Sequence, residues 1–161
     1  MTAIDYDTEF LEDGKTIALI SIGMVADDGR EYYAVNRRMP ARRIRRSPWL
    51  MANVVPSLPK PHGDWIFSMP KRWLFNYMDH CVKEPHVIAR EVRAFIEATA
   101  DPQLWAWYGA YDHVVLCQLW GRMVDKPAAV PMFTHDLKQE CDRLGSPELP
   151  SLPGVTEHTA G

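Results

Sequence analysis

The chain has 161 residues, 47% of them hydrophobic, which is enough for one substantial core and too few for two domains of ordinary size. It contains no apolar run of the roughly 20 residues that a membrane span needs, and its N-terminus lacks the basic and apolar layout of a signal peptide. Its three cysteines form no CxxC pair, which argues against a disulfide framework. We therefore expect one soluble domain over residues 1–161, in the cytoplasm and without membrane association.

The net charge of −3 does not suggest a nucleic-acid partner, but the charge is unevenly distributed. Six of the 18 lysines and arginines lie in residues 37–46, "RRMPARRIRR", which forms a local positive patch in an otherwise acidic chain. This patch has two interpretations, a solvated surface or a set of phosphate contacts. The candidates for phosphate contacts are Arg42, Arg43, Arg45 and Arg46.

The first 36 residues predict an antiparallel meander of three strands. Residues 4–10, 16–26 and 31–36 are rich in β-branched and aromatic residues, as strands are. The intervening turns read "EDG" and "DDG", and their glycines suit hairpins because glycine tolerates positive φ.

Residues 37–68 form a long basic, proline-rich insertion without persistent helical or strand periodicity. A connection of this length is either functional or flexible. The following pattern predicts helices over 70–81, 84–100, 112–123 and 134–145, the last ending at Gly145, with strands over 103–109 and 130–133. A meander followed by alternating helices and strands indicates an α/β fold with a mixed sheet.

Two carboxylates, Asp7 and Glu9, lie one residue apart in the first predicted strand. Alternate residues of a strand point to the same face, so these side chains project together, about 7 Å apart, and Asp5 extends the row. Partial burial would make their mutual repulsion costly, and a hard divalent cation such as Mg²⁺ or Mn²⁺ would relieve it. The alternative is an exposed and solvated row, which this short motif alone favours.

Asp112 follows a very apolar predicted strand and begins the next predicted helix. Ligand sites of α/β sheets usually form at the ends of strands, which makes Asp112 a candidate third carboxylate. Taken alone, an aspartate at this position is more typical of a helix N-cap.

Three segments together resemble the motifs of a known family. They are residues 6–35, "YDTEFLEDGKTIALISIGMVADDGREYYAV", residues 104–121, "LWAWYGAYDHVVLCQLWG", and residues 157–161, "EHTAG". These segments are similar to the DEDD superfamily of ribonuclease T-like and proofreading exonucleases, and more closely to the small bacterial 3′-5′ exoribonucleases of the mycobacterial type. The resemblance implies a ribonuclease H-like fold with a five-stranded mixed sheet.

The resemblance also implies roles by position. Asp7, Glu9 and Asp112 would hold two Mg²⁺ or Mn²⁺ ions, and His158 would be the general base of the histidine-bearing (DEDDh) form. Such a site hydrolyses the terminal phosphodiester at the 3′ end of RNA and releases a nucleoside 5′-monophosphate. Histidine titrates near neutral pH, which suits the base, although a histidine near a C-terminus would otherwise be read as structural or solvated.

The sequence departs from the family pattern at its C-terminus. In the family a fourth carboxylate follows the histidine by five residues, whereas this sequence ends at Gly161, three residues after His158. Either the natural protein continues with a C-terminal helix that is missing here, or the site is incomplete. We expect the former, because a chain ending one turn into a helix would leave core surface uncovered.

Aromatic residues near these motifs have two interpretations. Phe10 directly follows the first motif and could stack on the terminal base, a contact worth about 1–3 kcal/mol, or it could belong to the core on the opposite face of its strand. The group Trp105, Trp107 and Tyr108 is more typical of a core than of a binding platform.

The sequence thus predicts a metal-dependent 3′-5′ exoribonuclease, in which the preference for RNA rests on the resemblance. Three alternatives stay open: a non-catalytic nucleic-acid-binding module on the same fold, a 3′-5′ exonuclease of single-stranded DNA, and a phosphoesterase of small nucleotides. Relatives on this fold often dimerise, so a homodimer is one expected state.

Overall fold

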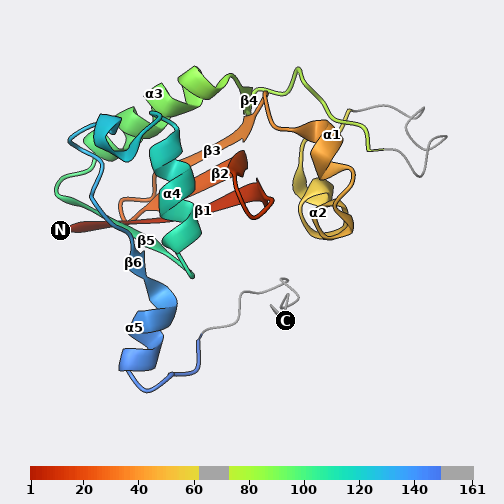
Figure 1. Ribbon diagram of the computed structural model, residues 1–161. Coiled ribbons are helices and arrows are strands. Elements are labelled where there is room, and N and C mark those ends of the chain that lie inside the picture. The colour runs from red at the N-terminus through yellow and green to blue at the C-terminus, as the bar shows by residue number, and fades with distance from the viewer. Residues whose placement is uncertain (62–72, 150–161) are drawn as a thin grey trace.

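A six-stranded sheet in the order β4-β3-β2-β1-β5-β6 organises the computed structural model, which describes residues 1–61 and 73–149 (Figure 1). β1 (Thr2–Glu12), β2 (Ile17–Ala26) and β3 (Glu31–Asn36) form the predicted antiparallel meander. β5 (Pro102–Ala106) runs parallel to β1, and two short strands, β4 (Val82–Lys83) and β6 (His135–Asp136), add parallel edges. The sheet is mixed, as predicted, but it has six strands rather than five.

One face of the sheet is covered by two helices. α3 (Pro85–Glu97) follows the predicted pattern, with Pro85 in its first turn, and it lies along the top of the sheet in Figure 1. α4 (Ala110–Gln118) packs against β1 and β2. The core between these layers consists of almost fully buried side chains, which include Ile4, Ile22, Met24, Ile88, Val92, Leu104 and Leu116.

Among residues 1–61 and 73–149, the cover on the opposite face is partial and comes from the connection between β3 and β4. Within it lie α1 (Ala41–Ile44), α2 (Pro48–Asn53) and the 3₁₀ turn η1 (Val55–Ser57). They form a second core with the sheet, which includes Leu11, Ile20, Val35, Ile44, Leu50, Val54 and Leu58. The expectation of no regular structure here was wrong for residues 41–57, because Pro40 and Pro48 precede or begin helices rather than interrupt them.

The helix predicted over 70–81 is absent from its described part, residues 73–81. Trp73, Phe75 and Tyr77 lie in a stretch without helix or strand and pack edge to face, with ring centroids 6.1 and 4.6 Å apart. The amide of Asn76 donates to the carbonyl of Pro59 at 2.9 Å, which ties this stretch to the preceding segment. Tertiary packing of the aromatic rings therefore overrides the helical pattern.

The remaining boundaries differ from the prediction for local reasons. The strand predicted over 103–109 ends at Ala106, because Trp107 and Tyr108 leave the sheet and Tyr108 adopts a left-handed φ of 55°. Trp107 and Tyr108 are 44% and 57% exposed, so the expectation that they belong to the core was wrong. The strand predicted over 130–133 lies instead at His135–Asp136, where it pairs with Trp105 and Ala106.

The last helix, α5 (Leu137–Arg143), starts three residues later than predicted. The carboxylate of Asp136 accepts hydrogen bonds from the amides of Lys138 and Gln139, at 2.9 and 3.1 Å, and so caps the helix. The helix terminates before Gly145, as predicted, and this glycine has a φ of +82° that favours glycine.

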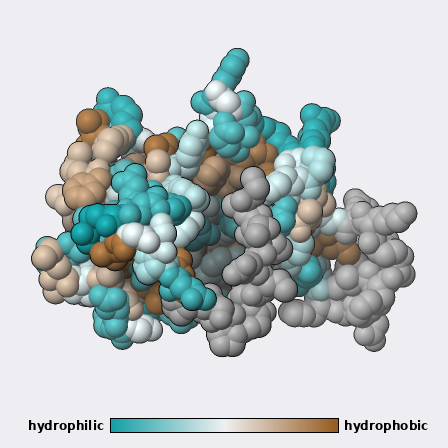
Figure 2. Space-filling model, turned by 90° about the horizontal axis from the view of Figure 1, so that it is seen from below, coloured by the Kyte–Doolittle hydropathy of each residue, from teal (hydrophilic) through white to brown (hydrophobic). Residues whose placement is uncertain are grey.

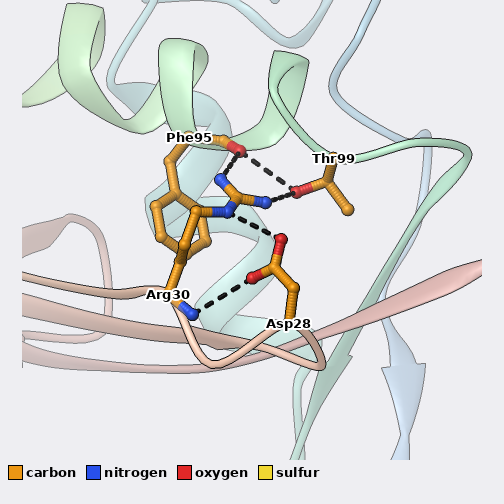
Figure 3. Close-up of polar contacts among 4 residues, drawn as sticks. All are labelled: Asp28, Arg30, Phe95 and Thr99. Atoms are coloured by element: carbon orange, nitrogen blue, oxygen red, sulfur yellow. Dashed lines mark hydrogen bonds and ion pairs between the residues drawn. The ribbon is translucent and has the colours of Figure 1, made fainter.

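Arg30, between β2 and β3, fastens the hairpin to the end of α3 (Figure 3). Its guanidinium donates to Asp28 at 2.8 Å, to the hydroxyl of Thr99 at 2.7 Å and to the carbonyl of Phe95 at 3.2 Å. It also lies over the Phe95 ring, 4.8 Å from the centroid. The meander is thus anchored at its turn as well as through its core.

None of the helices in the described ranges is long and apolar enough to cross a membrane.

Candidate active site

The carboxylate row of β1 lies on the partly covered face of the sheet. Ile4, Tyr6 and Thr8 are buried on the face below α4, while Asp7 and Glu9 point to the other side. The predicted alternation of this strand is therefore observed. A β-bulge follows Glu9, where Ile20 of β2 has no partner residue on β1, and the alternation of β1 continues to Leu11.

Cross-strand neighbours place the two carboxylates in a small cavity of about 180 Å³. Asp7 pairs with Gly23 and Glu9 with Ser21, and the residues opposite them on β3 are Tyr33 and Val35. The cavity is closed on its other side by the α2 and η1 segment, through Val54, Ser57 and Leu58. Gly23 leaves space beside Asp7 that a side chain would otherwise fill.

Asp112 reaches the same strand from the α4 side. It lies in the first turn of the helix, is 6% exposed, and accepts hydrogen bonds from the amide and the hydroxyl of Thr8, at 2.8 and 2.6 Å. The helix begins at Ala110, two residues earlier than predicted, so Asp112 is not the N-cap. The N-cap is Gly109, where an added Cβ would lie 2.9 Å from the Thr134 methyl group.

The three carboxylates influence each other electrostatically. Burial, and then the charge of Asp112, raises the pKa of Asp7. Burial, and then the charges of Asp7 and Asp112, raises the pKa of Glu9 to about 7. The site therefore concentrates negative charge, and a bound cation would favour the ionised forms of Asp7 and Glu9.

The donor chemistry fits a hard divalent cation. Carboxylate oxygens are the ligands that Mg²⁺ and Mn²⁺ prefer, and the charge repulsion at Glu9 is what such an ion relieves. Within residues 1–61 and 73–149, however, no three acidic, histidine or cysteine side chains stand close enough together to form a metal site. Asp7, Glu9 and Asp112 thus lie near one another without forming a closed cage.

Two further predicted site residues have different outcomes. His158, the predicted general base, lies outside the described residues. Phe10 is half-buried, and its ring stacks on Tyr111, with centroids 5.9 Å apart and an interplanar angle of 14°. Phe10 and Tyr111 follow Glu9 and precede Asp112 in the chain, so this aromatic pair lies beside the carboxylates.

The four candidate arginines occupy different environments. Arg43 and Arg46 line a groove next to Phe10, and Arg43 also pairs with Asp13 at 2.5 Å. Arg45 lies over the ring of Trp73, 5.2 Å from its centroid. Arg42 is exposed and lies outside the lining of that groove. The basic segment therefore does not act as one uniform patch.

Sequence reasoning missed Thr8 and Tyr111 as parts of the site. Thr8 is a plain strand residue in the sequence, and its contact with Asp112 spans 104 positions, which no local pattern reveals. Tyr111 could have been noticed in the sequence, because it directly precedes the candidate carboxylate Asp112.

Comparison with known proteins identifies the family. No family model matches the chain. Two curated relatives from Mycobacterium tuberculosis, of strains CDC 1551 / Oshkosh and ATCC 25618 / H37Rv, are each named a 3′-5′ exoribonuclease. Each is 43% identical over 150 residues, which span 92% of this chain and 79% of the relative. At this identity and coverage, the chain belongs to the same family as these 3′-5′ exoribonucleases.

Proposed function

We propose that the protein is a metal-dependent 3′-5′ exoribonuclease of the DEDDh type on a ribonuclease H-like fold. The observation that carries the proposal is the proximity of Asp7, Glu9 and Asp112 around the middle of β1, where burial and the charges of Asp7 and Asp112 raise the pKa of Glu9 to about 7. Carboxylates beside a cavity whose pKa is raised by burial and by neighbouring charge are typical of functional sites. The relatives' names supply the reaction.

Each residue has a distinct role in this proposal. Asp7, Glu9 and Asp112 would hold two Mg²⁺ or Mn²⁺ ions, and the hydrogen bonds from Thr8 would fix the orientation of Asp112. Bound there, the ions would supply an acidified water as nucleophile and stabilise charge on the leaving 3′ oxygen. His158 would accept the proton of that water. The bond from phosphorus to the 3′ oxygen breaks, and a nucleoside 5′-monophosphate leaves.

A shortening assay tests the proposal. We expect a 5′-labelled RNA incubated with Mg²⁺ or Mn²⁺ to shorten stepwise from its 3′ end, and we expect EDTA to stop the reaction. Asp112→Asn should lower kcat/KM by about a thousandfold or more, since the metal ions supply several kcal/mol of transition-state stabilisation.

Asp5→Asn is the matched control, because Asp5 lies on the same strand and face but does not line the small cavity. This variant should keep most of the activity. Binding of RNA without shortening would favour a non-catalytic module, and equal shortening of a matching DNA would remove the preference for RNA.

A further inference from the structure

A groove of about 540 Å³ lies between the end of β1 and the α1 and α2 segment. Phe10, next in the chain to Glu9, lines the groove together with Leu11. The other side is formed by Arg46 and by Trp49 and Leu50 of α2. Leu11 lies two residues beyond Glu9 on the same face of β1, about 7 Å along the strand, so the groove adjoins the carboxylate site.

Trp49 presents a large aromatic side chain to solvent from a fixed backbone. It is 64% exposed, and no ring contact engages its indole in the described part of the chain. Its helix is capped by Ser47, whose hydroxyl accepts from the Leu50 amide at 3.3 Å, and the carbonyl of Trp49 accepts from Asn53 at 2.9 Å. An exposed, rigidly mounted indole is suited to stack on a nucleobase.

Arg46 supplies a positive charge that is available to a ligand. Arg38 and Arg43 are engaged by Glu84 and Asp13, and Arg45 lies over the Trp73 ring. No acidic side chain pairs with Arg46 among residues 1–61 and 73–149. The acids that line the groove are themselves engaged, since Glu12 and Asp13 accept hydrogen bonds from amides of the β1 to β2 turn.

Phe10, which lines the groove, stacks on Tyr111, the residue that precedes Asp112. Tyr111 is 53% exposed, so the pair offers an apolar edge to a strand passing from the carboxylates into the groove. Aromatic surfaces combined with a cationic side chain are the usual means of binding single strands without sequence preference.

We propose that this groove binds the RNA upstream of the scissile bond, with Trp49 stacking on a base and Arg46 contacting a backbone phosphate. The inference rests on the proposed function, since it assigns the groove to the same substrate. It assigns a phosphate contact to Arg46 but not to Arg42, which lies outside the groove, and it adds Trp49 to the residues that contact the substrate.

A length series of 5′-labelled RNAs of two, three, five and seven nucleotides tests the role of Trp49. Trp49→Ala should lower kcat/KM about tenfold on the longest RNA, mainly through KM, and leave the dinucleotide almost unchanged, because only the longer strand reaches the groove. Trp49→Phe should restore most of the loss. Met132→Ala, which truncates another exposed apolar side chain outside the groove, should have no effect.

A loss that is equal at all lengths, or no loss at seven nucleotides, would overturn the inference. If the wild type hydrolyses none of the RNAs, the proposed function fails, and the groove is tested separately by fluorescence anisotropy of the seven-nucleotide RNA in EDTA. Weaker binding by Trp49→Ala then supports the groove, and unchanged binding rejects it.

Salt dependence tests Arg46 with a matched arginine. Each phosphate contact to a single strand adds about 0.7 to the slope of log affinity against log salt, so Arg46→Ala should reduce the slope by about that amount. Arg42→Ala should leave the slope unchanged. Equal effects of the two variants would mean that the basic segment attracts RNA only through its overall charge, and would reject a specific contact from Arg46.

Discussion

The two faces of β1 differ in their side chains and in how those side chains are packed. On the face below α4, Ile4 and Tyr6 are buried in an apolar core, whereas Asp7 and Glu9 line a cavity on the other face. Viewed from below, the surface of the molecule is a patchwork of hydrophobic and hydrophilic areas (Figure 2). A packed face thus provides the rigidity with which the opposite face can hold like charges together.

The largest expected effect is on stability, where truncating a side chain on the packed face should cost far more than truncating one on the open face. Ile22 is 1% exposed in the core, while Val25, on the same strand, is 47% exposed on the open face. Ile22→Ala should lower the free energy of unfolding by about 3 kcal/mol, because it leaves a cavity. Val25→Ala should change it by less than about 0.5 kcal/mol. Urea denaturation measures both, and similar values would mean that the open face is packed as well.

Thr8 joins the two faces, since it is buried in the strand and binds Asp112. Thr8→Val removes the hydroxyl donor and should cost about 1–2 kcal/mol of stability, with about a tenfold loss of kcat from a misplaced carboxylate. Thr16→Val is the matched control, because its hydroxyl binds Asp13 in an exposed turn at 3.1 Å. Loss of stability with unchanged kcat would reject a positioning role for Thr8.

The smallest effect concerns the charge on Glu9. Its pKa is raised to about 7, so in metal-free protein the folded state retains a proton that the unfolded state releases near pH 4.5. Stability from this group therefore falls as pH rises between these values. In EDTA, Glu9→Gln should match the wild type at pH 5 and exceed it by about 1 kcal/mol at pH 8, after allowance for solvent screening. A constant difference across this range would contradict the shift.

The strand pattern of this chain was predictable wherever local chemistry decides it. The two-residue period of β1 and the glycine turns fix the meander, and Pro85 marks the start of α3. Asp7 and Glu9 were noticed because acids are unusual in such a strand, but it was the resemblance to the exonuclease family that made them candidates for the site. Their roles as metal ligands, and that of His158 as a base, stay predictions, as do the cytoplasmic location and the homodimer.

The remaining features depend on contacts between distant segments. β6 forms at His135 because Trp105 and Ala106 offer a partner edge, not because of its own two residues. At Trp73 and Phe75, packing between the aromatic rings takes the place of the predicted helix. In the site, Asp112 is held by Thr8 rather than serving as a cap, and only the folded chain brings these residues together.

The hydrogen bond from the Thr8 amide to Asp112 has a consequence for the solubility of the protein. β5 pairs with β1 over Thr2 to Asp5, so beyond Asp5 the backbone of β1 has no strand partner on that side among the described residues. Such an edge is a template on which a strand of another molecule can add, and proteins commonly guard it with a charged side chain. Asp112 occupies that edge at Thr8. A residue proposed to hold the metal thus also shields the sheet from intermolecular strand pairing, so its loss would expose the protein to aggregation as well as inactivation.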